Sequence, residues 1–427
     1  MLGSLSTMSY KLAMMRCRFC QTPLIDMVID LGDQPSANRL LTASDINRLH
    51  HLKLNEKMPL TVYLCSNCAL VQLGNVEKPE SLFTEDYVYY SSYSKSWVKH
   101  AKIFVAEVIQ KFALSKASNV LEIGSNDGYL LQHFVGSKIP ARGVDPAAQA
   151  AMVAKEKGVD TFIGFFGVDM VDKIIAEFGQ CDLIVGNNVL GHILDIRGHV
   201  QAIKQVLSDD GVVSLEFPHL ANLVEFNLFD TIYDEHYYYF SILALQRIFA
   251  EFSLKIIEID ELDTHGGSLR VLATHQESAC YTTDGSVKKI IERERQLKLD
   301  RLDGYANFQK AIEEIREVAR SFIADEKQAG REIAGFGAAA KGNIFLNYCG
   351  LGANDIEFVA DDTPAKQGKY LPGTHIPVTS QDAIRHRQPD IVVILAWNFW
   401  DEICQLLDYT QAWECRLVTF VPSVKEN

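Results

Sequence analysis

The chain has 427 residues, of which 48% are hydrophobic and 22% are charged, so it has the composition of a globular protein of roughly two to four domains rather than a disordered or fibrous one. Its 41 Lys and Arg against 55 Asp and Glu give a formal net charge of −14, which argues against nucleic acid as a partner because phosphate-backbone binding needs clustered cations. No apolar run reaches the roughly 18 to 20 residues of a spanning helix, so no membrane partner is expected.

The N-terminal residues lack the pattern of a secretory signal, because Lys11 and Arg16 follow the few apolar residues instead of preceding them. We therefore expect a cytoplasmic, reducing location. The nine cysteines, an odd number, argue against a disulfide framework and make closely spaced cysteines candidate metal ligands.

Two C-x-x-C units predict a metal site in residues 1–80, with the ligands Cys17, Cys20, Cys65 and Cys68. The two-residue spacing lets both sulfurs of a unit face one ion, and four thiolates suit Zn²⁺. We expect a closed, structural zinc site in a small zinc-binding domain. The alternatives are unrelated buried cysteines and a redox pair, and a redox pair would need a neighbouring βαβ pattern that neither unit has.

Residues 81–285 are predicted to form an α/β domain with a doubly wound parallel sheet. A strand beginning near Val120 runs into a glycine turn at Gly124 and Gly128 and then into a helical pattern. The spacing differs from that of a dinucleotide fingerprint, and the acids Glu122 and Asp127 would repel phosphate. The loop therefore favours a nucleoside ligand without phosphate at this point.

The second predicted strand, 141–145, ends in Asp145, roughly twenty residues after the glycine turn, where a carboxylate reaches ribose hydroxyls. Further strands are expected over 161–163 and 181–187. An acidic loop followed by a ribose-binding acid is typical of an S-adenosylmethionine site, although incidental turn glycines in an α/β domain remain the alternative. The predicted methyl-donor residues are Glu122, Gly124, Asn126, Asp127, Gly128, Asp145 and Asn187.

Candidate catalytic residues follow strands of this domain. His236 lies in Tyr233-Asp-Glu235-His236, and a histidine beside a carboxylate can be oriented and tuned to act as a base near neutral pH. His236 is the first-choice base, and His192 is a second candidate. A tyrosine cluster over 87–93, which includes Tyr89, can offer a hydroxyl to a substrate oxygen. For His236, for His192 and for the tyrosines, a purely structural role is the alternative.

Residues 286–427 are predicted to form a second Rossmann-like α/β domain. Long helices over 286–330 precede a strand, a glycine turn and a helix over 332–343, and further strands are expected over 356–361, 390–397 and 415–420. This turn ends in Lys341 and has no acid, so backbone amides and the ammonium together suit a diphosphate. Just before this domain, the turn at His265 and Gly266 is predicted to lie beside a ligand or another segment.

From Cys17 to about Pro422 the chain resembles the sugar C-methyltransferases that act on nucleotide-linked keto-deoxysugars. The four paired cysteines resemble that family's zinc-binding domain, residues 120–128 its methyl-donor loop, and residues 335–343 and 362–367 its C-terminal lobe. The resemblance implies that His236 is the base and that Glu235, His192 and Tyr89 lie at the sugar, although Tyr87, Tyr89 and Tyr90 are too close together to say which faces it. It also implies that the Lys341 lobe holds the nucleotide, and the predicted substrate-binding residues are Lys341, Asn343, His265 and Gly266.

The implied reaction is methylation of carbon 3 of a 4-keto-deoxysugar. His236 removes the C3 proton, and Tyr233, Tyr89 or a protonated His192 stabilises the enolate that attacks the methyl group of S-adenosylmethionine. Zinc takes no part in the chemistry. The alternatives are methylation at a sugar oxygen or nitrogen, and a zinc-containing binding protein without turnover. The sugar, its nucleotide base, the stereochemistry at C3 and the oligomeric state stay open, a monomer included.

Overall fold

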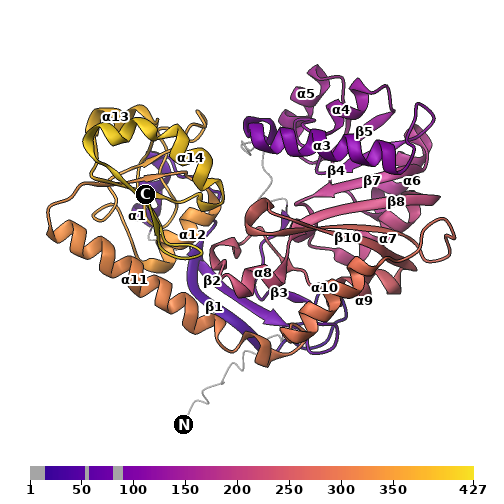
Figure 1. The fold of residues 1–427 in the computed structure, drawn as a ribbon, viewed down its shortest axis with the longest axis horizontal. Helices are drawn as coiled ribbons and strands as arrows, with labels where there is room; N and C mark the ends of the chain where they lie inside the picture. Colours follow the sequence, from indigo (N-terminus) through magenta and orange to yellow (C-terminus); the bar gives the residue numbers. More distant parts are fainter. Residues whose placement is uncertain (1–14, 53–56, 80–89) are drawn as a thin grey trace, which may run out of the picture.

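The computed structural model describes residues 15–52, 57–79 and 90–427. The strands of these residues form three sheets, one at the N-terminal end, one in the middle of the chain and one at the C-terminal end (Figure 1). The predicted α/β class with a small N-terminal domain and two Rossmann-like units is confirmed.

The N-terminal sheet is small and antiparallel, with the strand order β1-β2-β3-β9. It contains β1 (Asp26–Pro35), β2 (Lys57–Leu64), β3 (Val71–Leu73) and β9 (Tyr238–Tyr239), and α1 (Ala43–Leu52) follows β1 in the chain. Strand β9 lies within residues 81–285, yet it pairs Val71 with Tyr239 and Gln72 with Tyr238. The sheet is therefore completed by the residues that come directly after His236.

The middle sheet has seven strands in the order β10-β11-β8-β7-β4-β5-β6. The strands are β4 (Val120–Ile123), β5 (Ala141–Asp145), β6 (Asp160–Ile163), β7 (Cys181–Asn187), β8 (Leu207–Pro218), β10 (Leu254–Leu262) and β11 (Ser268–His275). Strands β4 to β8 are parallel, and β10 and β11 add an antiparallel edge. The predicted parallel sheet is confirmed, and the ends of β4, β5 and β7 meet at one edge, as parallel pairing requires.

Helices cover both faces of the middle sheet (Figure 1). One face packs against α3 (Lys95–Lys111), α4 (Leu131–Gly136) and α5 (Ala148–Glu156). The other packs against α6 (Val168–Phe178), α7 (Ile196–Val206), α9 (Ile242–Glu251) and α10 (Gly285–Gln296). The helix α8 (Leu220–Glu225) and the short 3₁₀ helices η1 (Ser91–Tyr93), η2 (Leu190–His192), η3 (Phe229–Thr231), η4 (Thr264–Gly266) and η5 (Leu302–Tyr305) lie in the connections.

The C-terminal lobe has six strands in the order β14-β13-β12-β15-β16-β17, all parallel except β17. The strands are β12 (Ile333–Phe336), β13 (Val359–Ala360), β14 (Val378–Thr379), β15 (Ile391–Ile394), β16 (Arg416–Thr419) and β17 (Lys425–Glu426). The helices are α11 (Phe308–Gln328), α12 (Ala340–Cys349), α13 (Asp382–Arg387) and α14 (Trp400–Leu406), with the 3₁₀ helices η6 (Trp397–Phe399) and η7 (Asp408–Trp413). The strands expected over 356–361 and 390–397 are shorter than predicted, because turn and 3₁₀ residues flank them.

One hydrophobic core joins the N-terminal sheet to the C-terminal lobe. It contains Val28 and Val62 of the N-terminal sheet, Phe229 of η3, and Phe345 of α12. Figure 1 shows β1 and β2 beside α11 and α12, with the middle domain on the other side. The segment 220–240 is therefore held between the N-terminal sheet and the C-terminal lobe, which matters because it contains the predicted base.

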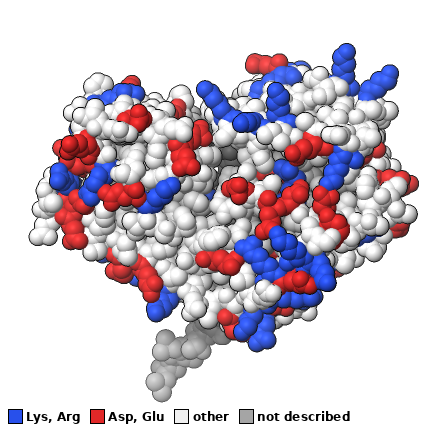
Figure 2. Space-filling view, viewed as in Figure 1, with Lys and Arg blue, Asp and Glu red and all other residues white. Residues whose placement is uncertain are grey.

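No helix among the described ranges is long and apolar enough to cross a bilayer. On the face drawn in Figure 2, acidic and basic side chains are interspersed over both lobes. This face therefore shows no continuous basic surface of the kind that a nucleic-acid backbone requires.

Candidate active site and metal centre

The four paired cysteines form a compact cluster. Their sulfurs all lie within 4.8 Å of one another, and the Sγ–Sγ distances are 3.6 Å for Cys17 and Cys68 and 3.4 Å for Cys20 and Cys65. Four sulfurs at about 2.3 Å from a tetrahedral Zn²⁺ lie about 3.8 Å apart, so the cluster fits zinc after a small expansion. The four predicted ligands are confirmed as one cluster. Four cysteines fill the tetrahedral coordination of one Zn²⁺, so no coordination position is left for a substrate.

The cluster is tied to the sheet that ends beside the predicted base. Gln72 of β3 donates from Nε2 to the sulfur of Cys17 over 3.2 Å, and its Oε1 accepts from the backbone of Arg18 over 3.0 Å. The same strand pairs with β9, and Leu73 donates its backbone N–H to the carbonyl of Tyr237 over 3.0 Å. Strand β3 therefore links the metal centre to the backbone that follows His236.

The predicted methyl-donor loop follows β4 and has the expected turn geometry. Gly124 has φ +68° and Gly128 has φ +75°, and a Cβ on Gly124 would lie 2.5 Å from a methyl group of Val189. Asp145, at the end of β5, accepts backbone hydrogen bonds of 2.8 Å from Asn126 and from Ala147. Asp145, the predicted ribose ligand, thus holds the glycine loop in place.

Several buried polar atoms at this edge have no hydrogen-bond partner among the described residues. They include Ser125 Oγ, Asp127 Oδ1, both amide atoms of Asn187 and Asn188 Oδ1. Buried polar groups are normally paired, so such a group of unpaired atoms fits a polar ligand. Burial raises the pKa of Glu122 well above its ordinary value, and the charges of Asp145 and Asp127 add to this. Burial therefore disfavours the charged form of Glu122, as expected for an acid enclosed at the end of a buried strand.

Two residues that the sequence reasoning missed close over this loop. Lys157 forms a 3.1 Å ion pair with Asp127 and donates to Ser92 over 2.6 Å, and Ser92 also bonds to Asp127. The backbone N–H of Ser91 donates to Asn126 over 2.9 Å. Asp127 is thus partly neutralised by a lysine, a contact between residues 30 positions apart that no local pattern signals.

The predicted catalytic residues His236, His192 and Tyr233 are in contact. The ring centroid of His236 lies 4.7 Å from that of His192 and 3.9 Å from that of Tyr233. Nδ1 of His236 lies 2.8 Å from the carbonyl oxygen of Thr231. Because a carbonyl only accepts, Nδ1 carries the proton and Nε2 keeps its lone pair.

This geometry leaves the imidazole of His236 neutral, with Nε2 unprotonated. Burial lowers its pKa well below 6.5, and the neighbouring His192, Lys341 and His265 lower it further. The expectation that a carboxylate orients His236 is wrong: Nδ1 of His236 donates to the backbone carbonyl of Thr231, and the carboxyl group of Glu235 bonds to Asn38. Main-chain carbonyls follow no side-chain pattern, so the sequence could not indicate this partner.

Glu235 and Asp234 are buried and bind the N-terminal domain. Glu235 accepts a 3.0 Å hydrogen bond from Nδ2 of Asn38, and Asp234 accepts from the hydroxyl of Ser36 over 2.6 Å and from the backbone of Ala37 over 2.9 Å. Burial and the charge of Asp234 raise the pKa of Glu235 to about 8. Glu235 is therefore mainly protonated near pH 7 and has a proton to donate.

His192 does not carry the charge that was expected of it. Burial lowers its pKa to about 4, and a hydrogen bond to the backbone of Glu235 opposes this shift only in part. The prediction of a protonated His192 is therefore wrong, because a cation without a buried counter-charge is too costly there. His192 supports the ring of His236 as a neutral neighbour.

The C-terminal lobe brings Lys341 to the same place. Its Nζ lies 4.6 Å from the ring centroid of Trp397, and Nε1 of Trp397 donates to buried Asp230 over 2.5 Å. A Cβ on Gly266 would lie 2.5 Å from Trp397, so the predicted tight turn rests against this lobe. His265, whose pKa burial lowers to about 4, contacts Trp97 at 5.4 Å between ring centroids.

The remaining predicted site residues are Asn343 and Tyr89. Asn343 is buried, and its Oδ1 accepts a 3.3 Å hydrogen bond from Asn347 on the next turn of α12, so part of its polar capacity is used inside the helix. Tyr89 lies outside the described residues, as does Tyr87.

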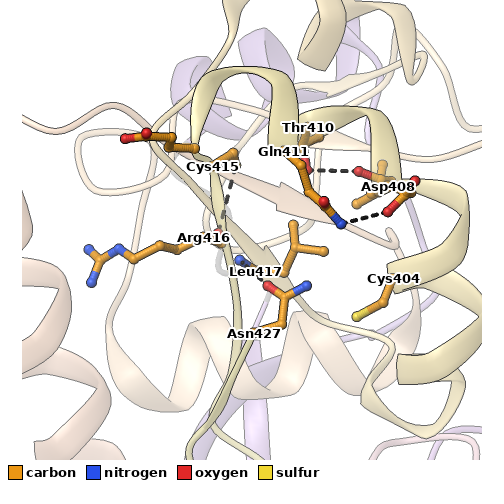
Figure 3. A pocket seen from close by; sticks show the side chains of 10 residues that line it. Cys404, Asp408, Thr410, Gln411, Cys415, Arg416, Leu417 and Asn427 are labelled. Carbon is orange, nitrogen blue, oxygen red and sulfur yellow. Dashed lines mark hydrogen bonds between the residues drawn. The ribbon is translucent and has the colours of Figure 1, made fainter.

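A cavity of about 400 Å³ on the C-terminal lobe contains none of the predicted site residues (Figure 3). Arg416 lines it, but this guanidinium forms ion pairs of 2.5 Å with Glu326 and 3.3 Å with Glu426. Because that charge is already balanced, the cavity offers an anionic substrate no advantage.

The pKa of Glu235 predicts a pH-dependent stability. Between pH 6.5 and 8 the folded state holds a proton on Glu235 that the unfolded state has released, so the free energy of unfolding falls as pH rises. For a pKa of about 8, the loss over this window is about 2 kcal/mol. Urea unfolding at both pH values is expected to show a smaller loss for Glu235→Gln than for wild type. Glu314→Gln on exposed α11 controls for the removal of one negative charge, and equal losses in all three proteins would contradict the prediction.

Comparisons with known proteins agree with this arrangement. Family models match residues 17–83 as a zinc binding domain, 97–259 as a methyltransferase domain and 263–422 as a C-methyltransferase C-terminal domain. The chain is 34% identical over 391 residues to C-methyltransferase NovU of Streptomyces niveus, across 91% of this chain and 90% of that protein.

Solved structures align with part of this chain. Magnesium protoporphyrin IX methyltransferase of Synechocystis PCC 6803 with bound SAM aligns over 42% of this chain and 79% of that chain, with 13% identity and a TM-score of 0.32. YcgJ protein of Bacillus subtilis aligns over 42% and 100%, with 18% identity and a TM-score of 0.33.

Proposed function

Because this chain belongs to the C-methyltransferase family and is an S-adenosylmethionine-dependent, zinc-containing C-methyltransferase, we propose that it methylates carbon 3 of a nucleotide-linked 4-keto-deoxysugar through an enolate. The observation that carries this proposal is the state of His236. Its Nδ1–H is committed to the carbonyl of Thr231, and the unprotonated Nε2 is available as a base.

Methylation at carbon needs such a base. A carbon nucleophile forms only when a C–H proton is removed, and a carbonyl group on the neighbouring carbon makes that proton acidic enough. Nε2 of His236 takes this proton, and the electron pair of the C–H bond becomes the double bond of the enolate while the carbonyl oxygen becomes an oxyanion. Positioned general bases contribute about 10²- to 10⁴-fold to such steps.

Neighbouring groups support the oxyanion. Tyr233 lies against the ring of His236, and a tyrosine hydroxyl near an enolate oxygen donates a hydrogen bond that strengthens as negative charge develops. Glu235, protonated because burial raises its pKa to about 8, is the acid closest in sequence to the base. Tyr89 is kept as a further candidate donor.

The methyl donor supplies an electrophilic methyl group. For its binding we propose Glu122, Gly124, Asn126, Asp127, Gly128, Asp145 and Asn187. Their support is the set of unpaired buried atoms at the ends of β4 and β7 and the fit of Asp145 to a ribose. Proximity then does most of the remaining work, since the enolate carbon and the methyl group must be aligned.

The test is incubation with S-adenosylmethionine and a panel of nucleotide-linked 4-keto-6-deoxysugars in deuterated water, followed by mass spectrometry. We expect one added methyl group, and deuterium at C3 when the methyl donor is withheld. Methylation of a hydroxyl or amino sugar but of no ketone would favour an O- or N-methyltransferase. Binding of both ligands without exchange or methylation would favour a binding protein.

A further inference from the structure

The ammonium group of Lys341 is buried and has no hydrogen-bond partner among the described residues. It lies over the face of Trp397, 4.6 Å from the ring centroid. A buried ammonium that donates no hydrogen bond is costly, because water would satisfy three donors. Such a group is retained where a ligand oxygen completes it.

The fold places this ammonium beside the base through one short segment. In η3, the carbonyl of Thr231 holds Nδ1 of His236, and the preceding residue, Asp230, holds Nε1 of Trp397. Helix α12, which carries Lys341, packs on η3. Two successive residues thus orient the base and the indole ring under the ammonium.

The charges agree with this arrangement. The positive charge of Lys341 contributes to lowering the pKa of both His236 and His265, which requires that it lies close to both rings. Burial lowers the pKa of Lys341 itself, and the carboxylate of Asp230 opposes that shift. The ammonium therefore lies within electrostatic range of both His236 and His265.

A diphosphate is a poor match for this position. It carries at least two negative charges, whereas the groups around Lys341 are one carboxylate, one indole and neutral histidines. A diphosphate beside Asp230 would be repelled, and one lysine would not neutralise it. A single oxyanion that appears next to the base during reaction is the better match.

We propose that Lys341 is a further catalytic residue, whose ammonium donates a hydrogen bond to the carbonyl oxygen of the keto substrate and stabilises the negative charge that forms there. This inference rests on the proposed enolate function. When Nε2 of His236 takes the C3 proton, the C–H electron pair forms the C3–C4 double bond and the C4–O π pair moves onto oxygen. Lys341 keeps its proton and shares it with that oxygen.

The experiment compares wild type, Lys341→Met, Lys341→Arg and the control Lys310→Met, which removes an exposed lysine of α11. The readouts are deuterium exchange at C3 without methyl donor, methyl transfer, and the affinity for S-adenosylmethionine and for thymidine or uridine diphosphate by calorimetry. Loss of an oxyanion donor lowers such rates about 10²- to 10³-fold, so Lys341→Met is expected to lose exchange and methylation to this extent. Its affinity for the nucleoside diphosphate is expected to stay within about threefold.

Lys341→Arg is expected to keep more C3 exchange than Lys341→Met, because it keeps a cation. If Lys341→Met fails to bind S-adenosylmethionine, the comparison of Lys341→Arg with wild type tests the role instead. Unchanged exchange in Lys341→Met would overturn the role of Lys341 alone. A tenfold lower affinity for the nucleoside diphosphate with unchanged kcat would also overturn this role, because it would show that Lys341 binds the diphosphate. Absence of exchange in wild type on every ketone would overturn the proposed function, and the role of Lys341 with it.

Discussion

Replacing His236 with asparagine is expected to lower kcat by about 10²- to 10⁴-fold, the contribution of a positioned general base. Asparagine can still donate a hydrogen bond to the carbonyl of Thr231, but its amide has no basic nitrogen at the position of Nε2. The predicted methyl-donor loop lies at the ends of β4 and β5, where Asn126 bonds to Ser91 and Asp145. Because these contacts do not involve His236, the affinity for S-adenosylmethionine is expected to change little.

The measurement is single-turnover methyl transfer together with C3 deuterium exchange, since the base acts in both. The matched control is His386→Asn on α13. That histidine has the same contact, a 2.8 Å separation of Nδ1 from a main-chain carbonyl, but it lies on the surface. Wild-type rates are expected for the control. An active His236→Asn variant would remove His236 from the mechanism.

Removal of zinc is expected to unfold the N-terminal domain and to abolish activity, although zinc takes no part in the chemistry. Structural Zn²⁺ contributes on the order of 10 kcal/mol to the folding of small domains, and without the ion the four clustered sulfurs lose the bonds that join the two C-x-x-C turns. Unfolding of the domain also breaks the pairing of β3 with β9 and the hydrogen bond from Asn38 to Glu235. The loop that carries His236 would then lose its fixed position.

This effect can be separated from damage to the methyl-donor site. Cys65→Ser is expected to bind less zinc, to melt in two steps and to lose C3 exchange, while it keeps most of its affinity for S-adenosylmethionine. Cys280→Ser, at an exposed cysteine, is the matched control and is expected to behave as wild type. Full exchange activity in zinc-free Cys65→Ser would show that the N-terminal domain does not position the base.

The metal centre and the glycine turn were each predicted from a local sequence pattern. The C-x-x-C spacing identified all four sulfurs of the metal centre, because two knuckles can present their sulfurs to one ion whatever lies between them. The glycine turn after 120–123 and the acid at 145 were found because a strand, a tight turn and a following strand lie within about 25 residues. Asp145 indeed holds this turn through the backbone of Asn126.

The second lobe repeats this geometry, which the sequence also indicated. Asp361, at the end of β13, accepts from the backbone of Ala338 over 2.8 Å and from that of Thr363 over 2.9 Å. Here, however, Lys366 also bonds to the acid over 3.2 Å. The strand and the turn were predictable from their sequence pattern. The contact of Lys366 with the acid was not, although the two residues are close in sequence, because no side-chain pattern in this loop indicates it.

By itself the sequence determined the fold class, the metal ligands and the segment that carries the base, since each depends on spacings within one stretch of chain. Only the tertiary structure decided the surroundings of the base. Asn38 reaches Glu235 across 197 residues, Trp397 reaches Asp230 across 167 residues, and the common core of the N-terminal sheet and α12 brings Lys341 to the same place. Burial there protonates Glu235 and neutralises His192, and burial is a property of packed neighbours that no short stretch of sequence contains.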